Sequence, residues 1–160
     1  MKLIGKFYIK HYRANKLIGE YNINNAVAIL GRNRLLDVMF HGTAASGTWY
    51  IGLVDNSGYT GFSVNDTIAS HTGWTEVTGY SEGTRVAWSE GAASDAVIAS
   101  SATSDFSITA TKTIKGIFLV NESTKGGTTG VLWATAAFAA NVDVENGDTL
   151  KVEYSVEASV

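Results

Sequence analysis

The clearest hydrophobic pattern in the chain lies near its C-terminal end. Between residues 149 and 156, apolar side chains at every second position alternate with lysine, glutamate and serine. A period of two places the apolar side chains on one face of an extended strand. The pattern therefore predicts a strand with one buried and one solvated face, and the Asn146-Gly147 pair before it predicts a tight turn.

Seven further runs rich in β-branched and aromatic residues precede this strand, separated by glycine, serine and threonine. They cover residues 48–54, 74–80, 85–90, 96–100, 105–110, 113–121 and 131–138. Eight short strands with turn signals between them predict an all-β fold, an antiparallel β-sandwich of jelly-roll-like topology.

A single helix is predicted before these strands. In residues 26–40 the apolar positions recur with helical spacing, Asn24 or Asn25 offers an N-cap, and Gly42 offers a stop. One side of this helix collects Val27, Gly31, Leu35, Val38 and Met39, and the other collects Asn33, Arg34 and Asp37.

The N-terminal segment differs from the body in charge. Residues 1–40 hold seven Lys or Arg against two acidic residues, whereas residues 41–160 hold five against thirteen. Two β-prone runs within residues 6–22 flank Ala14-Asn15, which predicts a hairpin or an extended arm. The chain is therefore divided into a basic arm or hairpin with the helix, residues 1–42, and a β-sandwich domain, residues 43–160.

The basic segment is the predicted docking surface. Its positive charges are spaced along an apolar pattern rather than clustered, which favours contact with acidic residues of a neighbouring subunit over binding to nucleic acid. The residues expected to make this contact are Phe7, Tyr8, Ile9, Tyr12, Arg13 and Lys16.

Two long connections are expected to add secondary contacts, because long loops in a compact domain often carry the interaction surface. They span residues 55–73, with a single helical turn expected near residues 66–71, and residues 121–130. The chain also has no proline, which removes one protection of exposed strand edges and favours edges covered by neighbouring molecules.

Composition narrows the class of protein. With 160 residues, 45% of them apolar, the chain is long enough for one domain with its own core. It has no cysteine, which excludes disulfides and thiol nucleophiles. No apolar run reaches the roughly 20 residues of a membrane-spanning helix, and Lys6 and Lys10 interrupt what a signal peptide would need. We expect a soluble protein made in the cytoplasm, with no cofactor.

Three motifs raise the question of catalytic or metal chemistry. Residues 79–83, GYSEG, match the G-x-S-x-G nucleophile elbow, but the residues that follow favour a strand where the elbow requires a helix. The histidines at positions 11, 41 and 71 lie too far apart for a local metal pair. Residues 55–58, DNSG, begin like a calcium loop but lack its closing glutamate.

Glutamates and tryptophans leave open the hypothesis that the protein cleaves or binds a glycan. Glu76, Glu82 and Glu90 lie near aromatic residues and could supply a glycosidase carboxylate pair, although such residues in strands more often point outward. The tryptophans are expected as core or interface anchors, with a carbohydrate-stacking platform as the alternative; they are Trp49, Trp74, Trp88 and Trp133. No catalytic, cofactor-binding or metal-binding residue is predicted, and the chain is not expected to be an enzyme.

Short motifs are spread over most of the body after the helix. They are TWYIGLVDNSG at residues 48–58, GWTE at 73–76, RVAW at 85–88, KGIF at 115–118, KGGTTG at 125–130, LW at 132–133 and NGDTLKV at 146–152. Together they resemble a group of small virion proteins of tailed bacteriophages. The resemblance implies a role in capsid decoration or cementing, although some members are associated with tail fibres, and it brings no catalytic residues.

The resemblance implies a virion protein that binds the outer capsid surface and cements neighbouring major capsid protein subunits as a homo-oligomer, a trimer or a dimer. The alternative is a tail or fibre-associated protein that contacts a host glycan through the tryptophan-bearing strands. A third hypothesis, a small glycan hydrolase or esterase, requires Ser81 or a glutamate pair to be catalytic.

Overall fold

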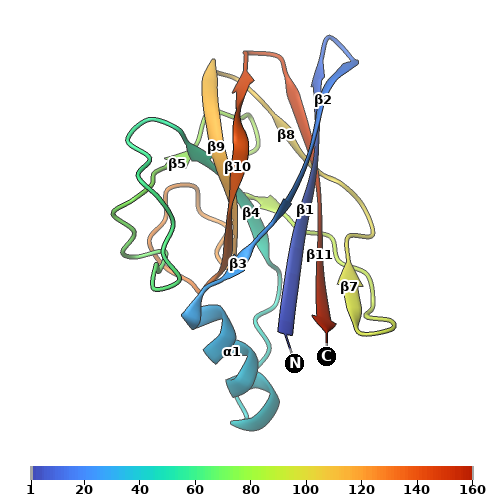
Figure 1. Cartoon of the computed structure of the whole chain (residues 1–160), viewed down its shortest axis with the longest axis vertical. Coiled ribbons are helices and arrows are strands. Elements are labelled where there is room, and N and C mark those ends of the chain that lie inside the picture. The colour runs from blue at the N-terminus through green and yellow to red at the C-terminus, as the bar shows by residue number, and fades with distance from the viewer. Residues whose placement is uncertain (1, 160) are drawn as a thin grey trace.

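Two antiparallel sheets face each other in the computed structural model, which describes residues 2–159 (Figure 1). The five-stranded sheet has the order β2-β1-β11-β7, with β8 also paired to β11, and the six-stranded sheet has the order β3-β10-β9-β4-β5, with β6 also paired to β4. The predicted all-β sandwich is confirmed, whereas the jelly-roll connectivity stays a prediction. No helix in the described part of the chain has the length and apolar character needed to span a membrane.

The strands of the first sheet are β1 (Lys2–Arg13), β2 (Lys16–Asn24), β7 (Val97–Ala99), β8 (Ser104–Ser107) and β11 (Thr149–Ser159). Those of the second sheet are β3 (Ala26–Val27), β4 (Tyr50–Asp55), β5 (Glu76–Val77), β6 (Val86–Ala87), β9 (Lys112–Val120) and β10 (Leu132–Val144). Each of the eight predicted runs contains a strand, and the alternation in β11 is confirmed because Leu150, Val152 and Tyr154 are buried.

The N-terminal segment is a hairpin built into the first sheet. Ala14 and Asn15 both have positive φ, 47° and 61°, which is the geometry of a tight type I′ turn. Strand β1 then pairs with β11 along its whole length, from Lys2 opposite Ser159 to Tyr12 opposite Thr149. The predicted boundary at residue 42 therefore does not separate an arm from a sandwich, since the hairpin supplies two of the sandwich's own strands.

The main core lies between the two sheets, where Phe7 and Ile9 from β1 meet Leu53 and Ile117 from the second sheet. A second cluster lies on the outer side of the six-stranded sheet, under the 55–73 connection. There Trp74 packs against Phe118, with ring centroids 5.1 Å apart. This connection contains an isolated bridge between Thr67 and Ser70 instead of the predicted helical turn, because its apolar residues fold down onto the sheet.

Helix α1 (Ile29–Phe40) begins later than predicted. Ala26 and Val27 pair with β10, so neither Asn24 nor Asn25 can cap the helix. The N–H groups of Ala28 and Ile29 donate instead to the carbonyls of Trp133 and Val64, each at 2.8 Å, which satisfies part of the unpaired first turn. Gly42, with φ +71°, follows the last turn as predicted.

Gly52 leaves room for the ring of Phe118 in the second cluster, on the outer side of the six-stranded sheet. A Cβ at this position would lie 2.2 Å from Phe118 Cζ. We expect Gly52→Ala to lower the free energy of unfolding by about 1–3 kcal/mol, because the ring must move out of a packed core. Urea unfolding tests this against Gly83→Ala, whose new methyl would meet no atom within 4 Å. Equal midpoints for the two variants would contradict the expectation.

Candidate interaction surfaces

The structure divides the six predicted docking residues into two groups. Phe7 and Ile9 are fully buried in the chain's own core, because residues of one parity along β1 face the opposite sheet. They are not available to a partner, and this part of the predicted docking set is wrong.

Tyr8, Tyr12 and Lys16 lie on the accessible side of the hairpin. With Lys10 and the exposed tip residues Leu17 and Ile18 they form a surface that we call the hairpin face. A shallow hollow of about 370 Å³ lies on it, and its walls include Tyr8, Lys10 and Tyr12. The hairpin face is mixed in character, with tyrosine rings beside lysine amines.

Charged neighbours hold parts of the hairpin face in place. Lys10 lies opposite Glu20 on β2, with Nζ 3.8 Å from the carboxylate. The Lys6 amine lies 5.2 Å from the centre of the Tyr8 ring. Exposed pairs of this kind contribute little to stability, so these side chains can be redirected toward a partner at small cost.

Arg13 ties the hairpin to the turn between β10 and β11. Its Nε and Nη2 donate to the Asp148 carboxylate at 2.9 and 2.8 Å, and Nη1 lies 3.1 Å from Glu145. His11 Nε2 lies 2.6 Å from the same Asp148 carboxylate, and the backbone N–H of Glu145 donates to it as well. Arg13 therefore fixes the hairpin's position rather than offering a free charge.

The buried Asp148 carboxylate has a strongly perturbed pKa. The hydrogen bonds from Arg13 hold that pKa well below its ordinary value, helped by the Glu145 N–H and by His11, while burial acts in the opposite direction. The same contact raises the pKa of Arg13. Asp148 is thus a permanent anion at neutral pH around which the base of the hairpin is organised.

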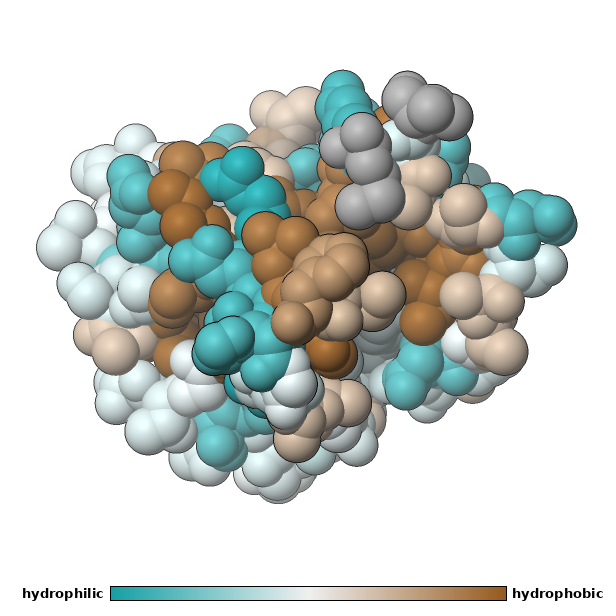
Figure 2. Space-filling model, turned by 90° about the horizontal axis from the view of Figure 1, so that it is seen from below, coloured by the Kyte–Doolittle hydropathy of each residue, from teal (hydrophilic) through white to brown (hydrophobic). Residues whose placement is uncertain are grey.

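The opposite end of the molecule is apolar. There β1 begins and β11 ends beside α1 (Figure 1). Seen from that end, hydrophobic residues gather around a central protrusion with a hollow beside it (Figure 2). We call this surface the α1 end. It is made by α1, the 41–49 segment, the start of β1, the end of β11 and residues 93–98, which lead into β7.

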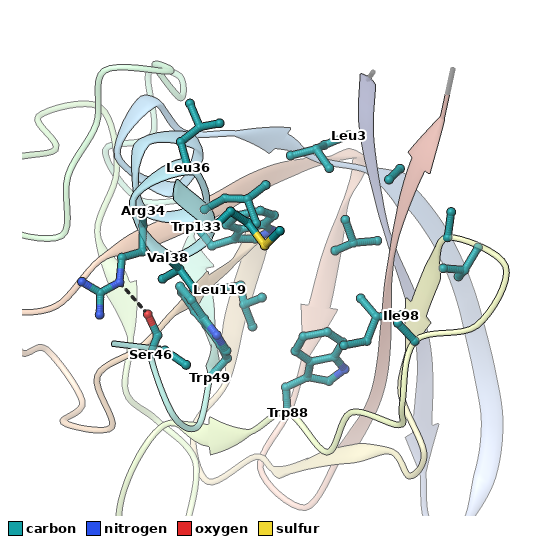
Figure 3. Close-up of a pocket in the computed structure, with 18 of the residues that line it drawn as sticks. Leu3, Arg34, Leu36, Val38, Ser46, Trp49, Trp88, Ile98, Leu119 and Trp133 are labelled. Carbon is teal, nitrogen blue, oxygen red and sulfur yellow. Dashed lines mark hydrogen bonds between the residues drawn. The ribbon is translucent and has the colours of Figure 1, made fainter. Parts of the chain in front are cut away.

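The hollow of the α1 end has a volume of about 680 Å³. Val38 and Trp49 line one side of it, while Trp88 and Ile98 line the other (Figure 3). The one charged side chain along its border, Arg34, turns outward, and its Nε donates to Ser46 Oγ at 2.9 Å (Figure 3). The inside of the hollow is therefore almost purely hydrocarbon and indole surface.

Three exposed side chains of α1 form part of the wall of this hollow. Leu36, Met39 and Phe40 are 53%, 64% and 81% exposed. The predicted apolar side of the helix included Met39 but neither Leu36 nor Phe40. The available signal was their spacing, because positions i, i+3 and i+4 form a second apolar stripe on the helix.

The 121–130 connection is held by a buried arginine. Arg85 donates through Nε and Nη2 to the Glu76 carboxylate at 2.9 and 2.8 Å, and through Nη1 and Nη2 to the carbonyls of Glu122 and Gly127. Its side chain has no exposed surface. The backbone N–H of Gly126 also donates to Glu76. This predicted secondary contact loop is therefore fixed to the sandwich.

The motifs weighed for catalysis have structural partners. Ser81 follows an isolated bridge at Tyr80 and leads through bends into β6, with no helix after it in the described chain. Glu76 is paired with Arg85, and Glu82 accepts the backbone N–H of Ser107. Within residues 2–159, no group of three His, Asp or Glu side chains is arranged to hold a metal ion.

The tryptophans are oriented inward or toward the apolar hollow. Trp74 and Trp88 are buried, and Trp49 packs edge-on against Trp133 with centroids 6.1 Å apart. The indole N–H groups of Trp74, Trp88 and Trp133 donate to Asp66, Ser100 and Tyr154 respectively. Trp74 therefore offers no open ring face on which a sugar could stack, and Trp88 borders only the apolar hollow.

Comparisons with known proteins give no further indication: a scan against protein-family models found no match, and a search of curated proteins found none either.

Proposed function

We propose that this chain is a virion structural protein of a tailed bacteriophage that binds the outer capsid surface and cements neighbouring major capsid protein subunits. The proposal starts from the resemblance of its motifs to small phage virion proteins. The observation that carries it furthest is the hairpin face, an exposed surface of lysine, tyrosine and aliphatic side chains on a rigid edge of the sandwich.

The hairpin face suits a lasting protein contact. Strand β2 is at the edge of its sheet, and Leu17 and Ile18 are exposed at its tip. Interfaces of this kind combine aromatic anchors with a polar rim. Because Asp148 and β11 hold the hairpin, little conformational entropy is lost when it binds.

No reaction is needed for this role. A cement protein adds buried surface across joints between shell subunits, and several weak contacts made by one oligomer reinforce each other through effective concentration. The lysines of the hairpin face fit an acidic patch on the shell, so attachment should weaken as salt screens the charges.

The test is co-sedimentation with capsid shells that lack the protein. We expect saturable binding by the intact chain, and a loss of affinity of about 30-fold or more for the double variant Tyr8→Ala, Lys16→Glu. Thr111→Glu is the control, because it adds a negative charge at an exposed residue that belongs to neither the hairpin face nor the opposite end of the molecule, where β1 begins.

Two results would overturn the proposal. One is failure of the intact protein to bind shells at any salt concentration. The other is unchanged binding by the double variant. Binding to host cells or purified host polysaccharide, measured in parallel without shell binding, would favour a tail or fibre location instead.

A further inference from the structure

The α1 end pairs a protruding apolar group with an apolar hollow. The protrusion is the exposed trio Leu36, Met39 and Phe40, which also forms part of the wall of the hollow of about 680 Å³. Contiguous apolar surface of this kind is uncommon on monomeric proteins and marks contact sites. The hairpin face lies on the other end of the hairpin's strands and does not use this surface (Figure 1).

The chemistry of the hollow favours an apolar protein side chain over a small molecule. Binding sites for small ligands place a few polar groups to orient the ligand. Here Arg34 is turned outward and engaged by Ser46 and by the carbonyl of Ala44. The wall itself is built from residues such as Trp88, Ile98 and Val156.

We propose that the α1 end binds a second copy of this chain, with Phe40 of each copy inserted into the hollow of the other. The protrusion and the hollow lie side by side on one face (Figure 2). A face that meets its own copy head-on is self-complementary and closes after two molecules. The assembly is therefore a two-fold dimer, and its bridging role in the capsid rests on the proposed function, whereas the dimer contact does not.

Charge complementarity supports a second copy as the occupant. Arg32 shares the helix stripe of Leu36 and Phe40, at spacing i, i+4 and i+8. Asp95 lies across the hollow, in the turn between the lining residues Ala93 and Ala96. Within residues 2–159 neither Arg32 nor Asp95 forms an ion pair. Insertion of Phe40 into the partner brings Arg32 of one copy toward Asp95 of the other.

A dimer joined at the α1 ends carries its two hairpin faces away from the joint. Such a molecule lying along a shell would touch two neighbouring subunits, one with each hairpin. The second contact becomes intramolecular once the first has formed, which is how a modest contact area produces firm attachment.

Sedimentation velocity and equilibrium of the purified chain, over a wide range of concentration and without shells, test the dimer. We expect a monomer–dimer equilibrium whose dissociation constant rises about 30-fold or more in Phe40→Asp. Phe40 is 81% exposed, so at concentrations where the parent chain is monomeric, circular dichroism should show the same thermal unfolding for both proteins. Ile18→Asp, an equally drastic change at an exposed residue of the hairpin face, should leave the dimer intact.

A double-mutant cycle tests the partner contact itself. Arg32→Gln and Asp95→Asn should each weaken the dimer several-fold, and the double variant should be no weaker than either single variant, because both remove the same contact. Asparagine is chosen since residue 95 has φ 51°, which asparagine tolerates. Additive losses would show that the two residues do not face each other and would overturn the geometry.

Two results would overturn the dimer: a parent chain that stays monomeric at every concentration, or a Phe40→Asp variant that still dimerises. If the parent chain is monomeric, shell binding by Phe40→Asp is measured as well, and that variant could then fail to bind. That failure would assign the α1 end to the shell. A parent chain that dimerises but does not bind shells would overturn only the proposed function. A parent chain that stays monomeric and binds shells through Tyr8 and Lys16 would overturn only the dimer.

Discussion

Replacing Arg85 with methionine is expected to lower the free energy of unfolding by about 3–5 kcal/mol. The Arg85 side chain has no exposed surface, and its Glu76 partner is 8% exposed. Without the guanidinium, a nearly buried carboxylate loses its counter-charge, and the carbonyls of Glu122 and Gly127 lose their donors. An orphaned buried charge costs far more than the loss of an exposed pair.

Urea unfolding of three variants measures this effect. Lys151→Met is the matched control, because the Lys151–Asp105 pair is also 2.8 Å long but its two side chains are 39% and 41% exposed; we expect a loss of no more than about 1 kcal/mol. The double variant Arg85→Met, Glu76→Leu should recover much of the loss, since no charge is left unpaired. Equal costs for Arg85→Met and Lys151→Met would contradict the role given to Arg85.

The same variant should loosen the 121–130 connection. Amide hydrogen exchange of residues 122–127 is expected to quicken in Arg85→Met, because Arg85 and Glu76 together hold Glu122, Gly126 and Gly127. This readout distinguishes loss of the loop's anchor from general destabilisation, which would quicken exchange in β9 and β10 as well.

Asp148→Asn is expected to lower the free energy of unfolding by about 2–4 kcal/mol at neutral pH. The Asp148 carboxylate accepts from Arg13, from the backbone N–H of Glu145 and from the His11 ring. An asparagine retains the shape but turns an N–H₂ group toward this set of donors and removes the charge that Arg13 pairs with.

The difference between the parent chain and Asp148→Asn should depend on pH. The pKa of Asp148 is lowered in the folded protein, chiefly by its hydrogen bonds with Arg13, so the unfolded chain takes up this proton at a higher pH than the folded chain does. The stability from Asp148 is therefore fully present well above the ordinary carboxyl pKa of about 3.9 and is lost as the pH falls below it.

Unfolding in urea at a series of pH values checks this sign. Between about pH 5 and about pH 3 the advantage of the parent chain over the variant should shrink by about 1 kcal/mol. A difference that stays constant over this range would show that Asp148 has the same pKa in the folded and unfolded states. His11→Gln serves as the control for loss of another contact at the same carboxylate.

These two buried ionic contacts connect the fold to the proposed interactions. The Arg13–Asp148 contact sets the position of the hairpin, and the Arg85–Glu76 contact sets the position of the 121–130 connection. Both arginines join segments that lie far apart in the chain. The proposed cementing role requires resistance to a mechanical load. Rigid contact surfaces suit that role, because the conformational entropy of ordering them is lost on folding rather than on binding.

The sequence indicated much of the candidate interaction surface, but it did not show which of the predicted docking residues are buried and which are accessible. Runs of β-branched and aromatic residues between turn signals, with clear alternation in the last of them, predicted eight strands, and the Ala14-Asn15 pair indicated a hairpin or an extended arm. The docking set mixed inward and outward residues because the buried side of an isolated hairpin is undefined until it pairs with another strand. Pairing with β11 decides that Phe7 and Ile9 face the core while Tyr8 stays outside.

The sequence by itself determined the local elements: the last strand from period-two alternation, the other seven predicted strands from β-branched and aromatic runs, one helix from its apolar spacing, and turns at Asn146-Gly147 and Ala14-Asn15. These follow from interactions between residues close in the chain. Only the tertiary structure decided that the basic segment joins the sandwich, that Arg85 and Asp148 are buried anchors, and that the exposed stripe of α1 borders a hollow. Each depends on contacts between distant residues, such as Arg13 with Asp148 and Arg85 with Gly127, which local periodicity does not encode.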